Sequence, residues 1–193
     1  MTENYIQDQY FEGIENDCLF WQTQRSNYEN CTFAACNFKQ TDMSEVRFYD
    51  CRFENCDLSL TDVKGTVFQN IAFHGCKLSG VLFDKCNQFG LELKFYDTKL
   101  DHSSFYDLKI NRAVFVQCSL KGVDYSAAQL KEAQFNGSDL TDAKFDQSHL
   151  EKADFRAAVH FVINPELNKV KGAVFSMDGL PGLLEAYKIK IAP

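Results

Sequence analysis

The sequence predicts an all-β protein, a right-handed quadrilateral β-helix in which four five-residue repeats complete each coil. Two observations predict this fold. A large apolar residue recurs every five positions through most of the chain, and similar residues recur every twenty. An α-helix turns every 3.6 residues and a strand alternates every two, so neither keeps a period of five on one face. The backbone must therefore turn once in each repeat.

The repeat begins near Cys31 and places a large apolar residue at its centre. The first register contains Phe33, Phe38, Met43, Phe48, Phe53, Leu58, Val63, Phe68, Phe73, Leu78 and Phe83, and a second register runs from Phe95 to Phe155. Phenylalanine then recurs at intervals of twenty, at Phe95, Phe115, Phe135, Phe155 and Phe175. Four repeats per coil let like residues stack on like. Coils that pair as strands do, about 4.8 Å apart, would give roughly eight coils in a rod near 40 Å long.

A small or β-branched residue precedes each centre by two positions, and most of the eight cysteines occupy this slot. Cys36, Cys56 and Cys76 alternate there with threonine, valine and alanine along the chain. We interpret them as small buried residues with reduced thiols, not as a disulfide framework. A straight column of thiols also cannot surround a tetrahedral metal ion, so no metal and no cofactor are expected.

The chain is expected to form a solenoid over residues 1–177 with two irregular stretches. Residues 1–30, which include Trp21, should cap the open N-terminal end, because terminal repeats must cover exposed edges. Phe83 and Phe95 are twelve residues apart instead of ten, so a register break is predicted at residues 86–94. The break is either a tolerated surface loop or a site that displays Asn87, Gln88, Phe89 and Glu92 to a partner.

Residues 178–193 change character and predict a short helix followed by a strand. Leu180, Leu183, Leu184 and Tyr187 have helical spacing with Asp178 as the expected N-cap, and Ile189 and Ile191 alternate with lysines. This segment could cap the last coil. Alternatively, its surplus apolar surface could pair two chains about a two-fold axis.

No arrangement of residues suggests catalysis, so the chain is not expected to be an enzyme. The four histidines lie in different coils and slots, and no nucleophile, metalloprotease or phosphate-binding motif is present. No apolar run approaches the roughly 18 residues of a membrane span, and no signal peptide is evident, which predicts a cytoplasmic protein without membrane contact.

Charge suggests one further candidate surface. The net charge of -7 argues against direct nucleic-acid binding, and much of the acidity lies in residues 1–30, so the repeat body is nearly balanced. Asp42, Glu45, Asp62 and Asp84 nevertheless map to one early face, diluted by Lys64 and Lys85. This cluster is either a solvated face or a stripe that binds a partner.

These features resemble the pentapeptide repeat proteins over about residues 18–175. Within them the chain is similar to the bacterial topoisomerase-protecting group of Qnr, microcin-immunity and albicidin-resistance proteins, on the residues of the break, the segment 163–168 and the tail 179–191. This resemblance implies a homodimer joined through Leu180, Leu183, Leu184, Tyr187, Ile189 and Ile191. It also implies a DNA-mimicking surface that binds DNA gyrase or topoisomerase IV, with the loop from Asn87 to Glu92 facing the enzyme.

Two hypotheses follow. The first is a non-catalytic protein that protects a type II topoisomerase from a poison and so confers antibiotic or toxin resistance. The second is an interaction scaffold unrelated to topoisomerases. The first is weakened because the long projecting loops of many Qnr proteins are absent here and the charge of the repeat body is modest for a DNA mimic.

Overall fold

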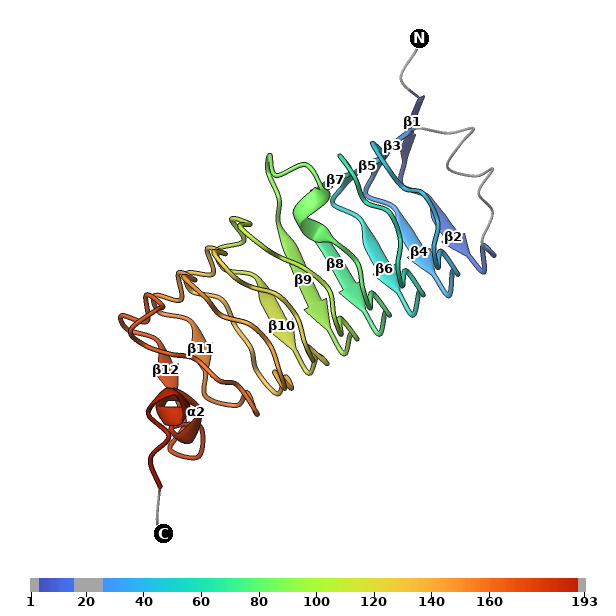
Figure 1. Cartoon of the computed structure of the whole chain (residues 1–193). Helices are drawn as coiled ribbons and strands as arrows, with labels where there is room; N and C mark the ends of the chain where they lie inside the picture. Colours follow the sequence, from blue (N-terminus) through green and yellow to red (C-terminus); the bar gives the residue numbers. More distant parts are fainter. Residues whose placement is uncertain (1–3, 16–25, 191–193) are drawn as a thin grey trace.

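The computed structural model describes residues 4–15 and 26–190, which form a rod of about eight stacked coils with the termini at opposite ends (Figure 1). Strands line two sides of the rod, and their bounds are β1 Asn4–Gln7, β2 Tyr10–Glu12, β3 Ser26–Glu29, β4 Thr32–Ala34, β5 Arg47–Tyr49, β6 Arg52–Glu54, β7 Val67–Gln69, β8 Ile71–His74, β9 Leu93–Tyr96, β10 Val114–Val116, β11 Asp154–Phe155 and β12 Val174–Phe175. The all-β solenoid predicted from the period of five is confirmed.

The strands form parallel sheets in which each strand pairs with its counterpart in the next coil. The sheet orders are β1-β3-β5-β7, β10-β9-β8-β6-β4-β2 and β11-β12. Phe33 pairs with Phe53, and Phe95 with Phe115, so neighbouring coils are offset by twenty residues. Isolated parallel bridges continue the same offset along the rest of each coil, as between Lys99 and Ser119. We name the four faces after the centres of one coil: the Phe95, Leu100, Phe105 and Ile110 faces.

The centres of the repeats fill the interior as columns. On the Phe95 face, nine phenylalanine rings from Phe11 to Phe175 stack nearly parallel, with centroids 4.6–5.2 Å apart. Rings of different faces meet edge-on across the core, as do Phe95 and Phe105 at 6.0 Å. Offset-stacked and edge-to-face contacts are the favourable geometries for aromatic rings, so the columns add specific contacts to simple apolar burial.

The small slot has a hydrogen-bonding role that the sequence did not reveal. At most corners its N–H donates to the carbonyl oxygen three residues earlier, as Val46 does to Met43. This bond is absent at Cys36, Cys56 and Cys76, the slot residues of the Leu100 face. Their N–H groups instead donate to the side chain at the same slot of the next coil. Each of these distances is 3.4 Å, and the acceptors are Cys56 Sγ, Cys76 Sγ and Thr98 Oγ1. A sulfur or hydroxyl is needed there because a buried N–H without an acceptor is costly.

The register break lies where the sequence predicts it. Val67 pairs with Asn87 at the usual offset of twenty, whereas Ile71 pairs with Leu93 at an offset of twenty-two. The two additional residues therefore fall between Asn87 and Leu93, after a 3₁₀ turn, η1 Phe83–Lys85. This stretch forms a turn that projects from the Ile110 face without disturbing the coils that follow.

At the N-terminal end, residues 4–15 form strands of the solenoid itself. β1 and β2 pair in parallel with β3 and β4, with Asn4 opposite Ser26 and Tyr10 opposite Thr32. Phe11 stacks on Phe33 with ring centroids 5.0 Å apart. The part of the predicted cap that the structure describes therefore adds two strands to the solenoid, paired at an offset of twenty-two. Trp21 lies outside the described residues.

The tail is helical but differs in detail from the prediction. A short helix, α2 Pro181–Leu184, continues as a 3₁₀ turn, η2 Glu185–Tyr187. The expected N-cap at Asp178 is wrong, because Leu180 precedes the helix without a side-chain cap and proline fills the first helical position, where its missing N–H costs nothing. The hydroxyl of Ser176 accepts a bond from the N–H of Gly179 instead, at 3.2 Å. Residues 188–190 are not in a strand.

Candidate partner-binding surfaces

The acidic cluster predicted from sequence lies on the Phe105 face. Asp42 and Asp62 pair directly across adjacent coils, and both side chains are exposed. One oxygen of each carboxylate accepts a backbone N–H two residues later, from Ser44 at 2.8 Å and from Lys64 at 2.9 Å. These aspartates thus stabilise the corners of their coils while keeping their charge at the surface.

Asp84 is on the same face but does not continue this row. Leu82 occupies the row position, and Asp84 Oδ2 forms an ion pair with Lys85 Nζ at 2.8 Å. The side chain of Asp84 is only 12% exposed, and its Oδ1 is buried without a hydrogen-bond partner. The structure therefore groups Asp42 with Asp62 and separates Asp84 from them.

The acidic surface extends farther along the rod than the sequence argument proposed. The Phe105 face carries Asp107, Asp124 and Asp146 in the C-terminal half, where Lys144 is the one basic residue of the repeats centred on Phe105, Tyr125 and Phe145. Net charge summed over the whole body hid this excess because bases on another face cancel it. Sorting charges by repeat position and face would have revealed it.

The loop at the register break holds the other predicted contact residues, Asn87, Gln88, Phe89 and Glu92. Its fold is set locally: Asn87 Oδ1 accepts the N–H of Phe89 at 2.9 Å, and Leu91 packs against the core. Phe89 is 85% exposed, more than the other large apolar side chains of residues 4–15 and 26–190. The backbone of Glu92 bonds to Phe68 and Ile71 of the preceding coil, and its side chain pairs with Lys94 Nζ at 2.9 Å. The loop thus displays one aromatic ring on a rigid base.

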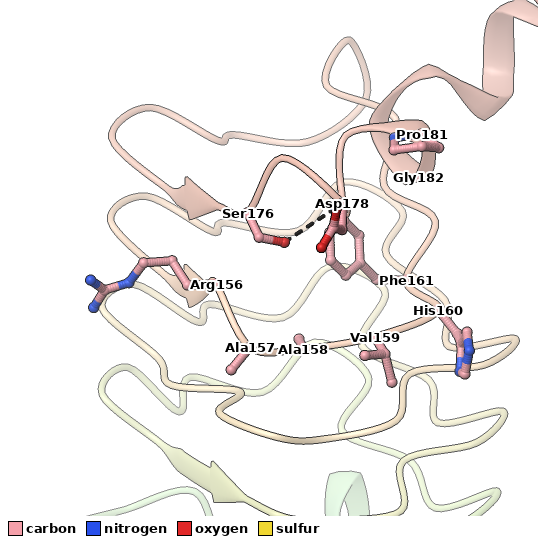
Figure 2. A pocket seen from close by; sticks show the side chains of 11 residues that line it. Arg156, Ala157, Ala158, Val159, His160, Phe161, Ser176, Asp178, Pro181 and Gly182 are labelled. Atoms are coloured by element: carbon pink, nitrogen blue, oxygen red, sulfur yellow. Dashed lines mark hydrogen bonds between the residues drawn. The ribbon is translucent and has the colours of Figure 1, made fainter. Parts of the chain in front are cut away.

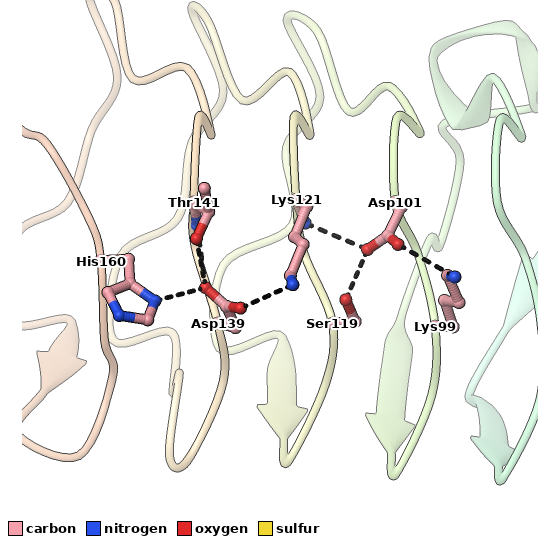
Figure 3. Close-up of polar contacts among 7 residues, drawn as sticks. All are labelled: Lys99, Asp101, Ser119, Lys121, Asp139, Thr141 and His160. Atoms are coloured by element: carbon pink, nitrogen blue, oxygen red, sulfur yellow. Dashed lines mark hydrogen bonds and ion pairs between the residues drawn. The ribbon is translucent and has the colours of Figure 1, made fainter.

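The Leu100 face carries a balanced polar network (Figure 3). Lys99 pairs with Asp101 at 3.4 Å, and Lys121 pairs with Asp139 at 3.2 Å. Partial burial tends to raise the pKa of Asp139, but hydrogen bonds from Thr141, His160 and Lys121 outweigh it and hold this pKa well below its usual range. Because acids and bases alternate here, this face offers no net field to a charged partner.

The tail lies against the last coil (Figure 2), and two of its glycines allow this close approach. A Cβ at Gly179 would meet the ring of Phe161, and one at Gly182 would collide with the backbone oxygen of Phe161. The carbonyl of Gly182 accepts the N–H of Ile163 at 3.0 Å, and Leu183 packs against the core. The tail therefore packs against Phe161 and Ile163 at the end of the rod.

The residues predicted for a dimer contact differ in exposure. Leu183 and Leu184 are partly buried, whereas Leu180, Tyr187 and Ile189 are 38%, 49% and 56% exposed. The hydroxyl of Tyr187 donates to Glu166 at 2.8 Å. Met177, which lies outside the helical spacing of the predicted contact residues, is 81% exposed beside this segment. Ile191 lies outside the described residues.

The described cysteines are buried thiols. The cysteines from Cys31 to Cys118 are free and buried, and burial raises the pKa of Cys51, Cys86 and Cys118 to about 12. Within residues 4–15 and 26–190, no three histidine, cysteine or acidic side chains gather closely enough to hold a metal ion. In the same part of the chain, no helix is both long and apolar enough to cross a bilayer.

The chain is similar to a family of repeat proteins and to solved structures of the same architecture. A family model described as "Pentapeptide repeat region" matches residues 26–94 and 81–155. Two trypsin-treated variants of QnrB1, a plasmid-mediated fluoroquinolone resistance protein, superpose on the chain. The first has a TM-score of 0.63 and 16% identity, and the match covers 98% of this chain and 100% of the variant. The second has a TM-score of 0.64 and 16% identity, with 97% and 99% coverage. Among curated protein sequences, none gave a significant match.

Proposed function

The chain belongs to the pentapeptide repeat family, and on this premise we propose that it is a non-catalytic protein that binds a type II topoisomerase and protects it from a poison. DNA gyrase and topoisomerase IV are the candidate partners. The observation that carries the proposal is the superposition on a fluoroquinolone resistance protein over nearly the full length of both chains. A likeness of rod length and shape is the property that a mimic of duplex DNA would need.

The Phe105 face is the proposed mimic surface. Each coil contributes at least one acid to this face from Asp42 to Asp146, and the coils are about 4.8 Å apart, although Asp84 is paired with Lys85. This charge is sparser than that of DNA, which carries one charge per roughly 1.7 Å of duplex, so shape must contribute as well as charge. An acidic stripe on a rigid rod would steer the protein toward the cationic DNA-binding surface of a topoisomerase.

The exposed loop is proposed to anchor the complex. Phe89 is a large aromatic side chain, and such residues dominate binding energy where they fill a pocket of the partner. The base of the loop is fixed because the N–H of Phe89 donates to Asn87 Oδ1 and the N–H of Glu92 donates to the carbonyl oxygen of Phe68, so ordering this ring on binding would cost little entropy.

We further propose that two chains associate through the tail. Leu180, Tyr187, Ile189 and Met177 expose apolar surface next to a helix that is already seated on the last coil. Contacts about a two-fold axis would bury this surface and place the two rods end to end.

The test measures supercoiling by gyrase and drug-stabilised DNA cleavage, with and without the purified protein. We expect the protein to reduce cleavage in the presence of a fluoroquinolone. No change in either reaction up to a large molar excess would refute the topoisomerase proposal and favour a scaffold with another partner.

Matched variants test the acidic face separately. Asp62→Asn with Asp124→Asn removes two charges from the Phe105 face, while the amide oxygen can still accept the N–H two residues later, which lies 2.9 Å away at both sites. Asp57→Asn with Asp154→Asn makes the same change on the Leu100 and Phe95 faces, where these acceptors are 3.0 Å from their donors. Protection should weaken several-fold in the first pair only. Equal loss in both pairs would refute the assignment of the face.

A further inference from the structure

The C-terminal half of the Ile110 face is strongly basic. We call the basic ridge the set Lys109, Arg112, Lys131, Lys152, Lys169 and Lys171. Parallel bridges link Lys109 to Gln129, Gln129 to His149 and His149 to Lys169, so these residues form one straight column. Backbone bonds from Arg112 to Lys131 and from Lys152 to Lys171 place the remaining cations beside it on consecutive coils. The ridge therefore spans four coils on one side of the rod.

Two glutamates neutralise only part of this charge. Glu132 pairs with Arg112 at 3.1 Å and with Lys152 at 3.8 Å, and Glu151 pairs with Lys131 at 3.3 Å. Within the described part of the chain, the ion pairs leave Lys109, Lys169 and Lys171 uncompensated. The side chains of Arg112 and Lys152 are 80% and 72% exposed even though they are paired. The ridge thus presents a net positive field to solvent.

The chemistry of the ridge indicates the kind of partner. Its other surface residues are Asn111, Gln129 and His149. The loop that carries the exposed ring of Phe89 borders the ridge at Lys109 and Asn111, and on the three coils that follow, no aromatic side chain of the described residues is exposed on this face. Protein interfaces usually have an apolar or aromatic core, and single-stranded nucleic acid needs aromatic rings for stacking. Lysine, arginine and amide side chains are instead the groups that contact phosphates of a duplex.

We infer that the basic ridge binds the phosphate backbone of duplex nucleic acid without sequence specificity. The rigid face places at least one of these cations on each of four consecutive coils, which are about 4.8 Å apart, so together they can contact several phosphates along a duplex. This inference is independent of the proposed function. It also differs from the expectation based on net charge, because that sum combines the acidic Phe105 face with the basic Ile110 face.

The test is fluorescence anisotropy of a labelled DNA duplex of about 20 base pairs titrated with the full chain at about 50 mM and 200 mM salt. With about four net phosphate contacts, affinity should fall roughly a hundredfold between these two conditions. The variant Lys109→Glu, Lys169→Glu, Lys171→Glu should weaken binding at low salt at least about tenfold and reduce the slope of log affinity against log salt by about three.

The control variant Lys39→Glu, Lys77→Glu, Lys99→Glu makes the same change in net charge on the opposite Leu100 face. It should retain much more affinity than the ridge variant, and matching thermal unfolding of both would exclude misfolding. No binding at low salt, or equal loss in the two variants, would overturn the inference. Equally tight binding to polyglutamate would also overturn it, since the ridge would then recognise acidic protein.

Discussion

Replacing Cys56 with alanine should destabilise the rod more than a simple loss of volume explains. The sulfur of Cys56 accepts the N–H of Cys36 at 3.4 Å and lies 3.2 Å from the carbonyl oxygen of Phe33. Alanine would leave the buried N–H of Cys36 without an acceptor, which costs about 1–3 kcal/mol in addition to the cavity.

Cys86→Ala is the matched control, because Cys86 is also a buried thiol but accepts no such bond. The residue that would have to donate to Cys86 is Thr66, one coil earlier in the same column. Its N–H already donates to the carbonyl oxygen of Val63 at 3.0 Å. The variant at Cys56 should therefore lose about 2 kcal/mol more than the variant at Cys86. For a chain of this size that difference corresponds to roughly 4–8 °C in melting temperature, measured by circular dichroism.

Threonine at position 56 should restore the missing acceptor. Thr98 occupies the same slot as Cys56, and its hydroxyl accepts the N–H of Cys76 at 3.4 Å. Cys56→Thr should therefore recover most of the stability lost in Cys56→Ala. Equal melting temperatures for the alanine variants at Cys56 and Cys86, or no recovery with threonine, would refute the role assigned to the column.

Three further predictions concern the surface. Phe89→Ala should abolish most topoisomerase protection with an unchanged melting temperature, because the ring is exposed; retained protection would contradict the anchor role. The double variant Leu180→Glu, Ile189→Glu should convert dimers to monomers in light scattering, and an unchanged dimer mass would exclude the tail as the interface. Leu183→Glu should instead lower the melting temperature, because Leu183 packs on the core. The folded-state pKa of Asp139 is depressed, so its stabilising contribution is complete above about pH 4 and disappears as pH falls through the lower folded value. Asp139→Asn should thus be less stable than the natural chain at pH 7, with a gap that narrows toward about pH 2; a constant gap would contradict this linkage.

The interior was predictable from the sequence because one strict period determines which side chains face inward. Phe95 and Phe115 stack because each coil repeats the geometry of the last, so the period identifies the columns and the break after Phe83 directly. The N-terminal strands escaped prediction because Phe11 and Phe33 are twenty-two residues apart, outside the period. The tail geometry also depends on tertiary contacts, since Gly179 and Gly182 are selected by their approach to Phe161.

The candidate surfaces were less predictable. The period identifies Asp42 and Asp62 as neighbours, but the withdrawal of Asp84 into an ion pair depends on the 3₁₀ turn at Phe83–Lys85. Overall charge concealed both the acidic Phe105 face and the basic ridge, because a sum over the chain does not record the face on which each charge lies. Assigning each charge to a face of the four-sided coil reveals both surfaces.

Because the coils stack in parallel, the number of coils sets the distance between two features of the rod. Each coil pairs only with its neighbours, and an unbroken run of coils separates the loop at Asn87 from the tail at Pro181. Removing one twenty-residue coil between them would bring loop and tail closer by about 4.8 Å while preserving their orientation about the rod axis. Shortening by five residues would instead rotate the loop by one face relative to the tail. The spacing between the two could therefore be adjusted in discrete steps to fit the distance between two sites on a partner.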